Sequence, residues 1–128
     1  MRLLLDTHAF LWWMQDDRRL PARTRARIAG GSEVLVSAVS IWEMAIKVAL
    51  GRLSLPGVDP AHLDDLISAC GFRELAVTAR HATCVATLAL HHTDPFDRLL
   101  VAQARVERAT FVSRDPAVVP YGVPVLWR

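Results

Sequence analysis

The sequence has few cysteines and no long apolar run, and these absences exclude several classes of protein. Its only two cysteines, Cys70 and Cys84, form neither a C-x-x-C motif nor a pair with zinc-ligand spacing. No apolar stretch approaches the roughly 20 residues that span a bilayer. An acid at position 6 leaves no room for the core of a signal peptide. We therefore expect a soluble, cytoplasmic protein, without a membrane partner, whose thiols are reduced and buried.

Common catalytic and cofactor motifs are also absent. The chain contains no G-x-x-x-x-G-K-[ST], G-x-G-x-x-G or G-x-S-x-G, which excludes P-loop, dinucleotide-binding and α/β-hydrolase interpretations. It has no H-E-x-x-H or Cys/His grouping of a zinc site. A haloacid-dehalogenase-type phosphatase would need a second aspartate where His8 stands. We interpret His91-His92 as the polar end of a helix, where imidazolium suits the helix dipole.

Lysine is almost missing, because Lys47 is the only lysine among 15 basic residues. A formal net charge of +2 does not by itself indicate a nucleic-acid-binding protein. Five arginines nevertheless cluster within and just before one predicted helix: Arg18, Arg19, Arg23, Arg25 and Arg27. Guanidinium groups suit phosphate oxygens, but a solvated helix face in an arginine-rich chain explains the cluster equally well.

Short apolar strands alternate with amphipathic helices along the whole chain. We predict strands over residues 2–6, 34–36, 73–77, 110–113 and 123–127, and helices over residues 8–15, 21–29, 38–50, 61–69, 78–91 and 94–108. Strands that are apolar on both faces are typical of a sheet covered by helices. The sequence therefore predicts one domain, residues 1–128, with a three-layer α/β/α sandwich around a mostly parallel sheet.

Isolated carboxylates lie at predicted strand ends and helix starts, and they are the strongest functional signal. They are Asp6, Glu43, Asp94, Asp97 and Asp115. Ligands of open α/β sheets bind at the carboxyl ends of the strands. Carboxylates gathered there are costly to desolvate unless they share a cation, and all-oxygen ligands favour Mg²⁺ or Mn²⁺ over zinc. The pattern predicts a metal-dependent, phosphate-cleaving site.

Each acid also has a local, structural interpretation. Asp6 could cap the helix that follows it, and Asp94, Pro95 and Asp97 together describe a good helix start. Asp115 could simply form a turn. A non-catalytic RNA- or protein-binding module whose acids only cap helices therefore remains an alternative.

Glu43 has two competing structural interpretations. Ser40-x-x-Glu43 matches a capping box, and Glu43 with Lys47 forms an i, i+4 ion pair. The preceding Ala38 and Val39 suggest that the helix begins nearer Ser37, which would place Glu43 in the second turn. The pair with Lys47 could then orient a functional glutamate.

Four segments together resemble the PIN-domain ribonucleases and, more closely, the VapC toxins of type II toxin–antitoxin pairs. They are L-L-L-D-T-H (3–8), S-A-V-S-I-W-E (37–43), D-P-F-D-R-L-L-V-A-Q-A (94–104) and S-R-D (113–115). The resemblance implies an endoribonuclease with a Mg²⁺ site, Mn²⁺ being possible, made of Asp6, Glu43, Asp97 and Asp115, with Asp94 as a neighbour. It also implies RNA as substrate, a cognate antitoxin as inhibitor, and a homodimer.

On this interpretation two arginines are candidates for binding the RNA backbone, Arg98 and Arg114, which would make binding sensitive to salt. We also expect Phe10, Trp12 and Trp13 to form an interface, because one short helix carries more aromatic surface than a small sandwich easily buries.

Overall fold

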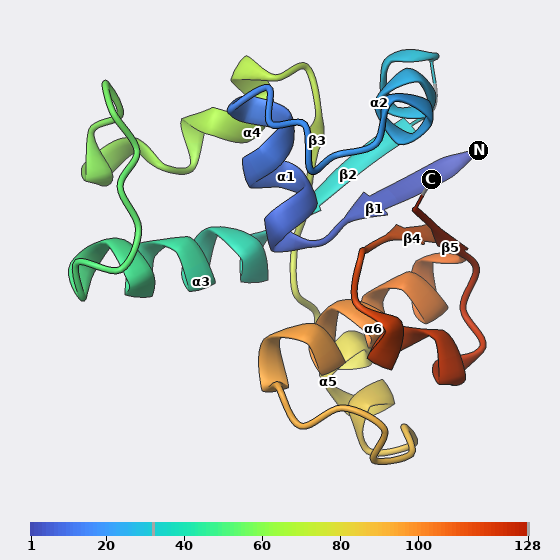
Figure 1. Ribbon diagram of the computed structural model, residues 1–128. Helices are drawn as coiled ribbons and strands as arrows, with labels where there is room; N and C mark the ends of the chain where they lie inside the picture. The colour runs from blue at the N-terminus through green and yellow to red at the C-terminus, as the bar shows by residue number, and fades with distance from the viewer. Residues whose placement is uncertain (32, 128) are drawn as a thin grey trace.

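A five-stranded parallel sheet lies between two layers of helices in the computed structural model, which describes residues 1–31 and 33–127 (Figure 1). The strands are β1 (Arg2–Leu5), β2 (Glu33–Ser37), β3 (Arg73–Leu75), β4 (Thr110–Val112) and β5 (Val125–Leu126). They pair in the order β3-β2-β1-β4-β5, and each described pairing is parallel. The predicted three-layer α/β/α sandwich is therefore confirmed.

The alternation of side chains along β1 explains the two helical layers. Leu3 and Leu5 enter one core with Phe10, whereas Leu4 enters the other core with Leu100. The first layer contains α1 (Thr7–Met14), α2 (Ala22–Ala29) and α4 (Asp65–Ala69), and the second contains α5 (Ala79–Val85) and α6 (Pro95–Glu107). Helix α3 (Ala38–Ala49) follows β2 and contributes side chains to both cores.

Two predicted helices are shorter in the structure. The one expected over residues 61–69 consists of a 3-10 turn, η1 (Pro60–His62), followed by α4. The one expected over residues 78–91 ends at Val85, so the prediction that His91-His92 closes a helix is wrong. The guanidinium of Arg98 on α6 donates to the carbonyls of Val85, Leu88 and Ala89. The side chain of Arg98 therefore satisfies carbonyls that would have accepted backbone hydrogen bonds in a longer helix.

The aromatic residues of α1 lie mainly inside the protein. Phe10 is fully buried, Trp12 is 7% exposed, and Trp13 is half-buried against the same core. The expectation that these three side chains form an open interface is therefore wrong for Phe10 and Trp12. Trp42 on α3 is instead 59% exposed, and its ring meets Phe96 edge-on at 5.1 Å between centroids.

Part of the arginine cluster connects α2 with the segment that follows α1. Arg19 pairs with Asp17 at 2.8 Å, and Arg25 approaches Asp16 at 3.3 Å. The Arg19 guanidinium also lies 4.7 Å from the centre of the Trp12 ring. Two of the five arginines therefore form ion pairs with aspartates of the segment between α1 and α2.

Neither cysteine is bonded to another, and both are half-buried rather than fully buried as the sequence predicts. Burial raises the pKa of the Cys70 thiol. Among the described residues, no helix is long and apolar enough to cross a membrane.

Candidate metal centre

Three of the predicted acids line one cavity at the carboxyl end of the sheet. Asp6 directly follows β1, Asp97 lies in the first turn of α6, and Asp115 follows β4 after a short turn. The carboxyl ends of parallel strands meet at the same edge, which brings these segments together. The cavity has a volume of about 310 Å³ and is lined by Asp6, His8, Trp12, Asp97, Arg114, Asp115 and Pro116.

Asp6 caps α1 and faces the cavity with the same carboxylate. Its Oδ1 accepts the Ala9 backbone N–H at 2.7 Å, so the capping interpretation is correct at the local level. The side chain is buried, and burial raises the pKa of Asp6. The Ala9 N–H and a hydrogen bond with Ser113 act in the opposite direction, while the charge of Glu43 raises the pKa further.

Asp94 and Asp97 have different positions at the start of α6. Asp94 is the N-cap, since its Oδ1 accepts the backbone N–H groups of Phe96 and Asp97. Asp97 caps nothing and points into the cavity, which Asp94 does not line. Burial raises the pKa of Asp97 to about 7, and the charges of Asp94, Asp6 and Glu43 contribute in the same direction.

Glu43 lies behind the cavity rather than in its wall. Thr7 donates to Glu43 Oε1 at 2.7 Å, and Lys47 donates to Oε2 at 2.8 Å, so the predicted i, i+4 pair is present. Ser37, not Ser40, caps α3, which excludes the capping box and places Glu43 in the second turn. Thr7 follows Asp6 directly in the chain, so Glu43 is connected to the site through its neighbour.

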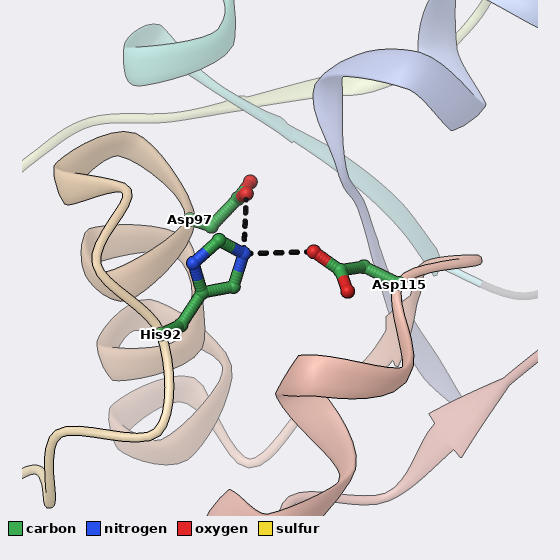
Figure 2. A group of neighbouring side chains, drawn as sticks. All are labelled: His92, Asp97 and Asp115. Atoms are coloured by element: carbon green, nitrogen blue, oxygen red, sulfur yellow. Dashed lines mark hydrogen bonds and ion pairs between the residues drawn. The ribbon is translucent and has the colours of Figure 1, made fainter.

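Asp115 meets a histidine that sequence reasoning did not assign to the site. Its Oδ1 accepts the Ala117 N–H at 2.9 Å, and its Oδ2 lies 2.7 Å from His92 Nε2. The same nitrogen lies 3.0 Å from Asp97 Oδ2 (Figure 2). The Ala117 N–H and the hydrogen bond with His92 lower the pKa of Asp115. The only sequence signal for His92 was its place two residues before the cap Asp94.

The donor set fits a hard divalent cation. Asp6, Asp97 and Asp115 offer carboxylate oxygens to one cavity, and such oxygens are the ligands that Mg²⁺ and Mn²⁺ prefer. Burial raises the pKa of Asp97 most, and the charges of Asp94, Asp6 and Glu43 raise it further. Positive charge placed among these carboxylates would therefore be stabilised.

The two arginines predicted to contact substrate lie in different places. Arg114 is exposed at the rim of the cavity, with its guanidinium 5.8 Å from the centre of the Trp12 ring. Arg98 donates instead to backbone carbonyls of residues 85–92 and to the hydroxyl of Tyr121. The geometry favours Arg114 over Arg98 as the arginine that faces a ligand.

The sequence matches a known protein family. A model of the PIN domain matches residues 3–119. Ribonuclease VapC22 of Mycobacterium tuberculosis is 31% identical over 114 residues, which are 88% of this chain and 86% of that protein.

Solved structures share the fold at lower identity. VapBC2 from Rickettsia felis, bound to a DNA fragment from its promoter, aligns with a TM-score of 0.70 at 13% identity and covers 100% of both chains. FitAcB from Neisseria gonorrhoeae aligns with a TM-score of 0.69 at 22% identity over 97% of this chain and 96% of that one.

Proposed function

The chain belongs to the PIN-domain family, and on that premise we propose that it is a Mg²⁺-dependent endoribonuclease acting as the toxin of a toxin–antitoxin pair. The observation that carries the proposal is the convergence of Asp6, Asp97 and Asp115 on one cavity, where burial and the neighbouring carboxylates raise the pKa of Asp97. Mn²⁺ would fit the same oxygen ligands.

The chemistry proposed is hydrolysis of an RNA phosphodiester. Asp6 and Asp97 would hold the ion, and Asp115 would complete its oxygen ligands. Glu43, fixed by Thr7 and Lys47 behind the cavity, would act through Thr7 on the position of the neighbouring Asp6. A divalent ion bound there supplies positive charge to the scissile phosphate and makes water a better nucleophile at neutral pH. Arg114, at the rim of the cavity, would hold the RNA backbone through its phosphates.

The partners proposed follow from the relatives. VapC22 is named a ribonuclease, and the similar structures are VapBC-type complexes, so RNA as substrate and a cognate antitoxin as inhibitor are the proposal for this chain. We place its action in the cytoplasm, where RNA is available. The exposed Trp42, packed on Phe96, offers an apolar surface that a second copy of the chain could cover in a homodimer.

A second candidate function is a binding module without catalysis. The observation in its favour is that Asp6, Asp94 and Asp115 all cap helices. Asp97 argues against it, because this carboxylate caps no helix and points into the cavity that Asp6 and Asp115 also line.

The test is cleavage of RNA by the isolated protein with Mg²⁺, with Mn²⁺ and with excess EDTA. We expect cleavage only with a divalent ion, and its loss in Asp6→Asn. Asp59→Asn is the matched control, since Asp59 also caps a helical turn but lies in the exposed loop that begins η1. A stable, metal-independent protein that binds RNA without cleaving it would favour the binding module.

A further inference from the structure

His92 occupies the space between two of the candidate ligands. Its Nε2 lies 2.7 Å from Asp115 Oδ2 and 3.0 Å from Asp97 Oδ2, as Figure 2 shows. Three such groups could be taken for a metal-binding triad. We propose instead that His92 is a positioning residue, which donates a hydrogen bond from Nε2 to Asp115 and keeps this carboxylate oriented beside Asp97. The inference rests on the proposed metal site.

The other ring nitrogen determines where the proton lies. The backbone N–H of Asp94 donates to His92 Nδ1 at 3.1 Å, so the lone pair of Nδ1 is in use. A neutral imidazole with an accepting Nδ1 carries its proton on Nε2. A protonated Nε2 has no lone pair to offer a metal, whereas it is a good donor to a carboxylate. The geometry thus makes His92 a partner of the ligands and not one of them.

Both oxygens of Asp115 are fixed by this arrangement. Oδ1 accepts the Ala117 N–H at 2.9 Å, and Oδ2 accepts from His92. The single Nε2 proton serves mainly Asp115, because that contact is the shorter of the two. Asp97 has the longer contact, so His92 engages the carboxylate of Asp97 less closely than that of Asp115.

The segment that carries His92 is held from two sides. Tyr121 Oη accepts the backbone N–H groups of His91 at 3.1 Å and of His92 at 2.9 Å. Arg98 donates to the Ala89 carbonyl at 3.0 Å and to Tyr121 Oη at 3.1 Å. The ring is thus fixed by α6 and by η2 (Pro116–Tyr121) before any ligand arrives. Prior fixation of this kind is what a positioning residue requires.

Three variants test the role through Mn²⁺ affinity, measured from the signal of free Mn²⁺ in electron paramagnetic resonance. His92→Phe keeps a ring without nitrogen, and we expect affinity to fall roughly 10- to 100-fold. His92→Gln retains a donor near the place of Nε2 and should restore affinity to within a few-fold of the wild type. His91→Phe is the matched control, because His91 is exposed and its ring packs edge-on against Tyr121; the Mn²⁺ affinity of this variant should not change.

Two measurements use the wild-type protein alone and do not depend on how the variants fold. Long-range ¹H–¹⁵N spectra of the metal-free protein should show the His92 proton on Nε2. Electron spin echo modulation of the Mn²⁺-loaded protein should show no directly bound imidazole nitrogen. A bound nitrogen, a proton on Nδ1, or unchanged affinity in a folded His92→Phe would each overturn the proposal.

Failure of this inference is distinguishable from failure of the proposed function. A wild-type protein that binds no Mn²⁺ overturns both. A protein that binds Mn²⁺ with the expected dependence on His92, yet cleaves no RNA, supports the positioning role and overturns only the ribonuclease.

Discussion

The acidic residues at the two ends of the parallel sheet have different surroundings. At the amino end, Arg2 bonds Glu33 at 3.0 Å and lies 3.6 Å from Glu107, while Arg73 bonds Glu33 at 3.0 Å. The buried His81 reaches Glu107 at 2.9 Å. Glu33 and Glu107 each have at least one basic partner, and the guanidinium of Arg2 holds the pKa of Glu33 below its ordinary range.

At the carboxyl end the acids face one another. Burial raises the pKa of both Asp6 and Asp97, and each of these pKa values is raised further by neighbouring carboxylates. The acids at the amino end are thus neutralised mainly by arginine, whereas Asp6 and Asp97 are buried beside other carboxylates. These two buried acids are the ones that we propose to hold the ion.

The largest expected effect is the loss of activity in Asp97→Asn. Asparagine keeps the shape of the side chain but removes the charge that holds the ion, so RNA cleavage should fall by roughly 100-fold or more. Cleavage rates at saturating Mg²⁺, with circular dichroism to confirm the fold, provide the measurement. Full activity in a well-folded variant would remove Asp97 from the site.

The second prediction concerns the dependence of stability on pH without metal. Since the pKa of Asp97 rises from 3.8 to about 7 on folding, the folded state binds more protons between these values. The contribution of Asp97 to stability should be fully present below about pH 4 and fall by roughly 3 kcal/mol as the pH rises to 7. Denaturant unfolding at several pH values measures it.

The matched variant for that experiment is Asp97→Asn, which should flatten the slope between pH 4 and 7. The lowered pKa of Asp115 acts in another window, because its contribution is lost only as the pH falls below its ordinary value. An unchanged slope in Asp97→Asn would assign the effect to another group.

The third prediction concerns apolar surface at the carboxyl end. Replacing the exposed Trp42 with serine should weaken self-association about tenfold or more and leave the melting temperature nearly unchanged. Trp12→Ser is the contrast, since it removes a buried ring and should cost about 3 kcal/mol of stability. Sedimentation and thermal melts measure the two effects. Equal dimerisation in wild type and Trp42→Ser would contradict the proposed interface.

The fourth prediction concerns the ion pair between Glu107 and His81 at the amino end of the sheet. Glu107→Gln leaves an acceptor for His81 but removes the charge, so we expect stability to fall by about 1 kcal/mol. RNA cleavage and Mn²⁺ affinity should stay at wild-type values, because the change lies at the opposite end of α6 from Asp97. A marked change in metal affinity would show that the two ends are coupled.

The smallest effect is expected for Asp94→Ser. Serine caps a helix nearly as well as aspartate, so stability should change by only a few tenths of a kcal/mol. Because the charge of Asp94 raises the pKa of Asp97, its loss should lower that pKa, which NMR titration of the metal-free protein measures. Complete inactivity of a stable Asp94→Ser protein would instead make Asp94 a ligand.

The sequence by itself determined the layers and the edge where the acids gather. Consecutive apolar residues such as Leu3, Leu4 and Leu5 point alternately to the two faces of a strand, so they specify a sheet that is covered by helices on both faces. An acid directly after such a strand must lie at its carboxyl end. The first turn of α6 was readable as well, because Asp94-Pro95 is a local signal for a helix start.

Only the tertiary structure decided the length of α5, the burial of Trp12 and the place of His92. Arg98 takes the carbonyls of Val85, Leu88 and Ala89, and His92 meets Asp115, which lies 23 residues further along the chain. Periodicity and capping patterns describe a residue's neighbours within a few positions along the chain. Contacts between distant segments depend on how whole elements pack, and no local pattern carries that information.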